Sequence, residues 1–173
     1  MCKDATDILP DLLRPGLKVV FCGTAAGAAS RKAGAYYAGP GNKFWRTLHT
    51  IGLTPTQLTP ENFPDLLNYG IGLTDLSKTG FGADVDLAAG SFDVVRFGAA
   101  IAAAAPTIVA FNGMKAARVF MGLQSSAVAY GVQSQSAIPG QIIAILPSTS
   151  GAASGFWSIK PWRELAKYLD GLR

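Results

Sequence analysis

The sequence predicts an α/β protein, a three-layer α/β/α sandwich with a central, mainly parallel four-stranded sheet. Short, almost wholly apolar runs recur along the chain, as expected for strands that are buried on both faces. Segments with helical character separate these runs, so helices are expected to cover both faces of the sheet. Loops of small and hydroxyl-bearing residues follow several runs. In open parallel sheets, ligands bind beyond the carboxyl ends of the strands, so these loops are the predicted site.

The predicted strands are the apolar runs with the fewest interruptions: Lys18–Thr24, Gly70–Leu76, Thr107–Phe111 and Gln141–Leu146. A weaker run at Ala127–Val132 is compatible with a further short strand. The predicted helices are Asn42–Ile51, Glu61–Tyr69, Phe92–Ala105, Lys115–Met121 and Ile159–Leu172. The stretch Ala25–Gly41 is predicted to be a long loop, and loops of this length in a compact domain are often binding segments.

The composition narrows the class of protein. The 173 residues are 49% hydrophobic and 15% charged, which favours a single domain over residues 1–173 and excludes a disordered chain. No apolar stretch reaches the roughly 20 residues that span a bilayer, and the acidic residues near the start are untypical of a secretory signal. The chain has one histidine and two cysteines, and their spacing is not that of metal ligands. We therefore expect neither a metal site nor a cofactor. We expect a reduced, monomeric, cytoplasmic protein without a membrane partner, and its net charge of +4 suits a polyanion.

The loop after the first predicted strand consists of small residues from Gly23 to Ser30. Small side chains at Thr24, Ala25 and Gly27 allow a ligand to approach the backbone closely. A nucleotide-binding loop is the alternative interpretation. It is disfavoured because the glycine spacing is not G-x-G-x-x-G and no acidic residue ends a second strand about twenty residues later.

Two further loops carry aromatic and hydroxyl groups. In the first, Tyr37 offers a flat ring for a base and Lys43 a cation for a phosphate. In the second, the serines after Pro147 offer hydroxyls that suit phosphate contacts, although an ordinary Ser/Thr turn would have the same composition.

Five motifs, in this order along the chain, resemble those of the uracil-DNA glycosylase superfamily. They are GTAAGAAS, AYYAGPGNKFW, GIGLTDL, FNGMKAA and LPSTSGAAS, and together they span Val19 to Ser154. The resemblance is to the mismatch-specific uracil/thymine DNA glycosylases and to the related hypoxanthine-DNA glycosylase branch. It implies an enzyme of base excision repair that flips uracil, or hypoxanthine as a second candidate, out of DNA and hydrolyses its glycosidic bond.

The resemblance also implies roles for individual residues. Tyr37 would stack on the flipped base, near Thr24, Ala25 and Gly27 of the first loop and the edge-reading Asp75. The residues expected to contact the DNA backbone or the base stack are Lys43, Asn112, Lys115, Ser148, Ser150, Ala152 and Ser154.

Three positions depart from the mismatch-specific pattern, one of them Ala26, which replaces a proline. Ala25 stands where those enzymes carry an asparagine that positions the attacking water, and Ala152 stands where a larger side chain fills the gap left by the flipped base. The last loop also lacks the histidine of the main uracil-DNA glycosylases. His49 lies within a predicted helix and is interpreted as structural.

Asn42 and Asp75 are therefore the candidate catalytic residues. Asn42 resembles an asparagine that matters in the hypoxanthine branch, and its amide could hold water or a base carbonyl. Capping of the following helix is an equally good interpretation. Asp75 ends the second predicted strand and could orient water or accept from the base. Its alternative role is to cap the turn at Ser77 or Lys78.

Two other functions stay open at the level of sequence. Ala25 and Ala152 are compatible with a catalytically inactive homologue that binds lesions or abasic sites. The small-residue first loop is also compatible with a nucleotide-binding α/β protein unrelated to DNA.

Overall fold

A computed structural model describes residues 6–123, 128–134 and 136–172. Its sheet has five strands in the order β2-β1-β3-β5-β4. The strands are β1 (Val19–Gly23), β2 (Ile71–Asp75), β3 (Ile108–Asn112), β4 (Gly131–Val132) and β5 (Ile142–Leu146). All neighbouring pairs are parallel except β4 with β5. The α/β class is confirmed, and the four predicted strands are the parallel ones.

The predicted strand count was too low by one. The extra strand β4 has two residues and pairs antiparallel with the edge of the sheet at β5. So short an element carries no period of its own in the sequence. The weak run at Ala127–Val132 contains it, but residues 124–127 lie outside the described part of the chain, and residues 128–130 are not in a strand.

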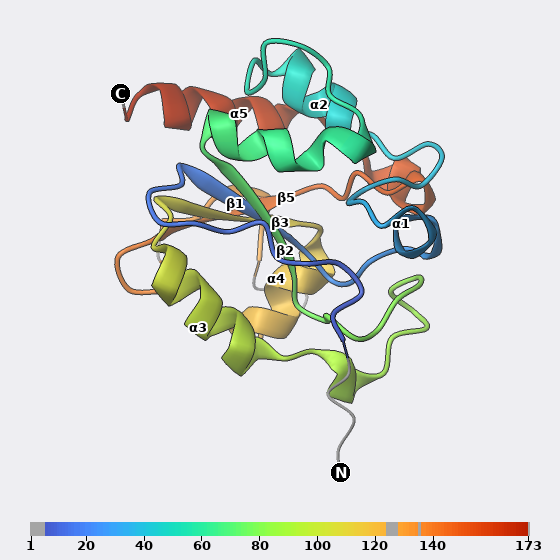
Figure 1. Ribbon diagram of the computed structural model, residues 1–173. Coiled ribbons are helices and arrows are strands. Elements are labelled where there is room, and N and C mark those ends of the chain that lie inside the picture. Colours follow the sequence, from blue (N-terminus) through green and yellow to red (C-terminus); the bar gives the residue numbers. More distant parts are fainter. Residues whose placement is uncertain (1–5, 124–127, 135, 173) are drawn as a thin grey trace.

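Helices cover both faces of the sheet (Figure 1). On one face lie α2 (Phe44–Thr50), the 3-10 helix η1 (Pro60–Tyr69) and α5 (Lys160–Asp170), and on the other lie α3 (Val94–Ala104) and α4 (Met114–Met121). Alternate residues of β1 divide between the two layers, because successive side chains of a strand point to opposite faces. Val19 and Phe21 belong to the core beneath α2 and α5, whereas Val20 and Cys22 belong to the core beneath α3 and α4.

The predicted loop Ala25–Gly41 is not wholly a loop, because it contains the helix α1 (Ala28–Ala33). Only Ser30 of this helix is buried, so the sequence has no apolar stripe that would reveal it. The helix ends at Gly34, which takes the left-handed conformation at φ 64°.

The predicted helix at Glu61–Tyr69 is a 3-10 helix, η1. Pro64 inside it has no N–H group, so an α-helical hydrogen-bond ladder cannot run through this position. The shorter 3-10 helices η2 (Ala89–Ser91) and η4 (Gly151–Phe156) complete the elements named here.

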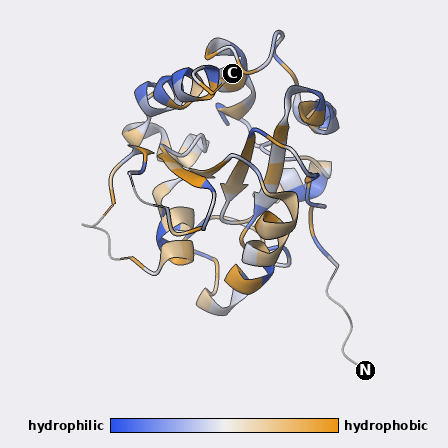
Figure 2. Ribbon diagram, turned by 90° about the vertical axis from the view of Figure 1, so that its left-hand side faces the viewer, coloured by the Kyte–Doolittle hydropathy of each residue, from blue (hydrophilic) through white to orange (hydrophobic). Residues whose placement is uncertain are grey.

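The hydropathy of the chain follows this layering. Figure 2 shows hydrophobic residues along the strands in the interior and hydrophilic residues on the outer side of the helix near the C-terminus. That helix, α5, buries Trp162, Leu165, Ala166 and Leu169 on one side. The Trp162 ring stacks on Phe21 with a centroid distance of 5.4 Å, and its indole N–H donates to the carbonyl of Pro147 over 3.0 Å. Helix α5 therefore holds both the sheet and the loop that follows β5. Among the described residues, no helix is long and apolar enough to cross a membrane.

Gly72 tests how tightly the β1–β2 edge is packed. A Cβ atom at this position would lie 2.6 Å from Leu17 Cδ1 and 2.7 Å from the carbonyl oxygen of Leu12, closer than a Cβ can approach. We expect Gly72→Ala to lower the free energy of unfolding by about 1–3 kcal/mol, as overpacked cores do. Urea denaturation measures this.

Gly98→Ala is the matched control. Gly98 lies inside α3, and an added Cβ there would have no neighbour within 4 Å. Alanine is the better helix former, so this variant should gain about 0.5–1 kcal/mol. Equal effects of the two substitutions would contradict the packing described for Gly72.

Candidate active site

The carboxyl ends of the four parallel strands meet at one edge of the sheet. Gly23 at the end of β1 pairs in register with Asp75 at the end of β2, and Asn112 of β3 pairs with Leu146 of β5. The loops after these residues include Thr24, Ser148 and Ser150. This edge therefore brings together most of the residues that the sequence predicted as a site.

Asp75 is buried at this edge, with 4% of its surface exposed. Its carboxyl group lies against the bare backbone of Gly23, since a Cβ atom on Gly23 would be 2.6 Å from Asp75 Oδ1. Burial raises the pKa of Asp75 to about 7, while the charge of Lys78 acts to lower this pKa and the charge of Asp11 raises it further. Near neutral pH the carboxyl group can thus serve either as a hydrogen-bond donor or as an acceptor.

Asp75 lies next to a network of three charged residues: Asp11, Lys78 and Arg96. Asp11 of the N-terminal segment accepts hydrogen bonds from the Thr74 hydroxyl at 2.7 Å and forms ion pairs with Lys78 and Arg96, each at 2.8 Å. Arg96 also donates to the backbone carbonyl of Asp75 at 2.6 Å. Lys78 is itself buried, at 5% exposure, and donates to the Tyr36 hydroxyl at 3.2 Å. Two cations and two carboxyl groups thus lie together, which offsets the cost of burying Lys78 and Asp75.

Tyr37 has a left-handed backbone at φ 54°, a conformation that a bulky residue adopts only under constraint. Its ring stacks on Phe44 at a centroid distance of 4.0 Å. Its hydroxyl is close to Asp75, because the same Cβ built on Gly23 would be 3.7 Å from the Tyr37 oxygen. Burial and the Asp75 charge raise the pKa of Tyr37, so its hydroxyl keeps its proton. The Tyr37 hydroxyl and the Asp75 carboxyl group therefore lie near the same point, without a hydrogen bond between them.

Asn42 lies just before α2 and is partly exposed. Its Oδ1 accepts a hydrogen bond from the backbone N–H of Phe44, the first residue of α2, at 3.0 Å, while Lys43 is the N-cap residue of this helix. Within the described part of the chain, the Asn42 amide nitrogen has no hydrogen bond.

Asn112 faces the final loop. Its amide donates to the Thr149 hydroxyl at 2.9 Å, and its carbonyl oxygen accepts from the Thr149 backbone N–H at 3.0 Å. Both residues are buried. Asn112 thus fixes the position of the final loop, and its contact with DNA stays a prediction.

The final loop and the aromatic loop are joined to each other. The backbone N–H of Lys43 donates to the carbonyl of Thr149 at 2.9 Å, and its ammonium group donates to the Ser154 hydroxyl at 2.7 Å. Within the final loop, Ser148 and Ser150 accept from the backbone N–H groups of Ser150 and Ala152 at 3.3 Å each. These contacts order the loop from which the predicted phosphate-binding serines project.

The first loop is held by the segment that follows β2. The Thr24 carbonyl accepts from Ser77 at 2.8 Å, and the Thr24 hydroxyl donates to Asp84 Oδ1 at 2.5 Å. Lys115 also donates to Asp84, at its backbone carbonyl. Ala25 is partly exposed and Gly27 exposed, and neither has a polar side chain.

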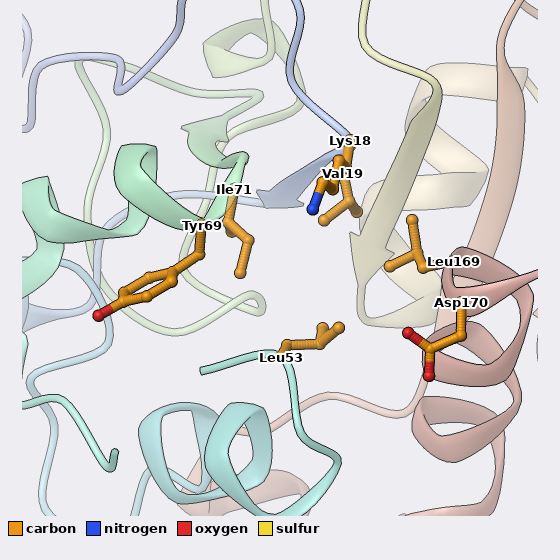
Figure 3. A pocket seen from close by; sticks show the side chains of 7 residues that line it. All are labelled: Lys18, Val19, Leu53, Tyr69, Ile71, Leu169 and Asp170. Atoms are coloured by element: carbon orange, nitrogen blue, oxygen red, sulfur yellow. The ribbon is translucent and has the colours of Figure 1, made fainter. Parts of the chain in front are cut away.

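Other features lie away from this edge. The pocket in Figure 3 is lined by Lys18, Val19, Leu53, Tyr69, Ile71, Leu169 and Asp170, at the edge where β1 and β2 begin. It is therefore separated from the candidate site by the length of the strands. His49 contacts the Thr54 carbonyl at 3.3 Å, at the end of α2. No group of histidine, cysteine and acidic residues in the described ranges could hold a metal ion.

The family follows from comparison with known proteins. The sequence model of the uracil DNA glycosylase superfamily matches residues 10–171. The chain belongs to this superfamily. Among solved structures, it is similar to the solution NMR structure of a candidate uracil DNA glycosylase from Methanosarcina acetivorans. The TM-score is 0.68 with 22% sequence identity, over 96% of this chain and 98% of the other, so this likeness concerns the fold.

Sequence reasoning did not find four residues of this glycosylase-family site: Asp11, Lys78, Arg96 and Thr149. The Asp11–Arg96 contact joins residues 85 positions apart, and the Asn112–Thr149 contacts join residues 37 positions apart. No local motif signals such pairs. The unusual feature that could have drawn attention is Lys78 itself, a cation only three residues after a buried strand.

The pH dependence of stability tests the burial of Asp75. Its pKa is about 7 in the folded protein and 3.8 as the ordinary value, so between these values the folded state binds the extra proton. The free energy of unfolding should therefore fall as the pH rises from about 4 to about 7, with a slope of up to about 1.4 kcal/mol per pH unit. Asp75→Asn should remove this fall. Urea denaturation at several pH values measures it.

Asp65→Asn, at an exposed position in η1, is the control and should keep the wild-type slope. A slope unchanged in Asp75→Asn would show that another group titrates.

Proposed function

We propose that this chain is a monofunctional DNA glycosylase that flips uracil, with hypoxanthine as a second candidate base, out of DNA and hydrolyses its N-glycosidic bond. The observation that carries the proposal is the pair formed by Asp75 and Tyr37, a buried carboxyl group near a buried hydroxyl at the carboxyl edge of the sheet. Membership of the superfamily supports the reaction class. Its partner would be DNA that contains a deaminated base, and we expect it to act as a monomer in the cytoplasm.

Base flipping costs a few kcal/mol, which contacts within the pocket must offset. Tyr37 would supply the stacking platform, because its ring is braced from one side by Phe44. Asp75 would read the base edge: an ionised carboxylate accepts from a ring N–H, and the protonated form donates to a carbonyl oxygen.

In the bond-breaking step, the C1′–N bond cleaves and its electron pair leaves with the base. The sugar becomes an oxocarbenium-like centre, and water then adds to C1′ and loses a proton to solvent or to the departing base. Donors directed at the developing negative charge on the base stabilise this transition state, and each is worth about 3–4 kcal/mol. The protonated form of Asp75 would be such a donor, and the Tyr37 hydroxyl, which keeps its proton, lies near it.

Water has to be positioned without an asparagine at residue 25. Asn42 is our candidate for this role, since its amide nitrogen is uncommitted among the described residues and its oxygen is fixed by Phe44. Lys43, Lys115 and the serines of the final loop would bind the phosphates on either side of the flipped nucleotide.

An inactive homologue that binds lesions or abasic DNA is the second candidate function. The specific observation in its favour is that Ala25 carries no group that could activate water, and that the neighbouring Thr24 hydroxyl is already bonded to Asp84. Tight binding to lesion DNA without turnover distinguishes this candidate from the enzyme.

An excision assay tests the proposal. Oligonucleotides with uracil or inosine opposite each base are incubated with the protein, and abasic sites are revealed by alkaline cleavage. We expect turnover with uracil, and a loss of about 100-fold or more in Asn42→Ala and Asp75→Ala, as for loss of one positioned hydrogen-bonding group in an active site.

Asn68→Ala, at an exposed position in η1 three residues before β2 begins, should leave the rate unchanged. If the wild-type protein cuts none of these substrates at high concentration, the enzyme proposal fails.

Two substitutions at Tyr37 separate its ring from its hydroxyl. Tyr37→Leu removes the aromatic face and should weaken binding to uracil-containing DNA about tenfold, within the range for base stacking. Tyr37→Phe keeps the ring and should bind as the wild type does but excise more slowly, because the donor beside Asp75 is lost. Fluorescence anisotropy measures binding, and single-turnover excision measures the chemical step. Equal binding by both variants would contradict the stacking role.

A further inference from the structure

Phe156 is the most exposed aromatic residue of the described chain. Its exposed fraction is 81%, whereas the next aromatic side chains, Phe81 and Tyr130, are each 42% exposed. A single exposed apolar residue is common on protein surfaces and does not define a site. The place of Phe156 in the fold gives its exposure a meaning.

Phe156 is the last residue of η4, the short helix into which the final loop of the candidate site runs. This helix lies against the aromatic loop. An added Cβ on Gly151 would be 3.4 Å from the Pro40 carbonyl oxygen, and Ser154 of the same helix accepts the 2.7 Å hydrogen bond from Lys43. Phe156 therefore projects from an element that borders the loop bearing Tyr37 and Asn42.

The backbone around Phe156 is fixed at both sides. Ser150 caps the start of η4 by accepting from the Ala152 N–H at 3.3 Å. The residue after Phe156, Trp157, packs on the buried Trp162 at a centroid distance of 6.2 Å and lies beneath the Lys43 ammonium, 5.6 Å from its ring. One of two adjacent aromatic rings thus anchors the segment, while the other points into solvent.

We propose that Phe156 is the wedge that enters the DNA base stack beside the flipped nucleotide. This inference rests on the proposed glycosylase function. The family position for a gap-filling side chain holds Ala152, whose methyl group is too small to replace a base. Proteins that unstack DNA insert an apolar side chain from a rigid element between base steps, and Phe156 has this character.

The surroundings of Phe156 suit duplex DNA. Lys43 lies against the adjacent Trp157, and Lys160 follows four residues after Phe156 with an exposed side chain, so cations are available for the phosphates on either side of a step. The residues before Phe156 in η4 include Ala152, Ala153 and Gly155. These small residues leave room for the DNA backbone to approach.

Single-turnover excision from duplex and single-stranded uracil substrates tests the wedge. A single strand has no stacked partner strand to hold open, so only the duplex reaction should depend on Phe156. We expect Phe156→Ala to slow duplex excision about tenfold and to change single-strand excision less than twofold. Phe156→Leu, which keeps apolar bulk, should retain most of the duplex rate.

Val95→Ala is the matched control, because Val95 is 80% exposed on α3, on the other face of the sheet. Its rates should equal those of the wild type on both substrates. The wedge is overturned if Phe156→Ala behaves like Val95→Ala on duplex DNA, if it loses both substrates equally, or if Phe156→Leu is as slow as Phe156→Ala.

A binding experiment separates this inference from the proposed function. 2-Aminopurine placed next to a stable abasic analogue in a duplex brightens when the stack is opened, and no turnover is needed. The wild-type protein should raise this fluorescence and Phe156→Ala should not. If no substrate is excised, the glycosylase proposal fails while this measurement still decides the wedge: an equal rise with both proteins overturns it.

Discussion

The parallel pairing of β1 with β2 places Gly23 opposite Asp75, and the rest of the candidate site depends on this contact. The carboxyl group of Asp75 occupies the space that a side chain on Gly23 would fill. The Tyr37 hydroxyl oxygen is 3.7 Å from the position of that missing side chain. Residues of β1, β2 and the aromatic loop therefore meet at Gly23. A residue other than glycine at the end of β1 would displace the carboxyl group, and with it the donor–carboxyl pair.

Burying Asp75 creates an electrostatic problem that the fold resolves with residues far away in sequence. Lys78, in the turn after β2, is buried. Arg96 of α3 donates a hydrogen bond to the backbone carbonyl of Asp75. Asp11 then binds both cations, so the N-terminal segment closes the network. Removing Asp11 would leave the buried Lys78 ammonium group without its ion pair, which destabilises a fold more than the net contribution of the pair. The strained backbone of Tyr37 and the raised pKa of Asp75 occur together here, as is typical of functional sites.

The sequence predicts the frame of this arrangement better than its details. The four parallel strands are predictable because short, largely apolar runs between turn residues are typical of strands buried on both faces. Helix α1 was missed because almost all of its side chains are exposed, and β4 because two residues have no periodicity. Thr24, Asp75 and Ser148 were correctly gathered at one edge, since parallel strands bring their carboxyl ends together. The Asp11 network was not predicted. Its contacts join residues that are separated by 63 and by 85 positions in the sequence, and such contacts leave no local pattern.

The hydrogen bonds of this edge also narrow which groups are free to act. The Thr24 hydroxyl is bonded to Asp84, and both ends of the Asn112 amide are bonded to Thr149. Ala25 contributes only a methyl group. Among the described residues, the candidate groups are the Asp75 carboxyl group, the Tyr37 hydroxyl and the Asn42 amide nitrogen, which come from β2 and the aromatic loop rather than from the first loop. The same displacement applies to the proposed wedge, because Ala152 has only a methyl group whereas Phe156 of the same short helix is large and exposed. Ala25 cannot position water and Ala152 cannot fill the space of a base. We propose that Asn42 and Phe156, on nearby ordered segments, perform these two functions instead.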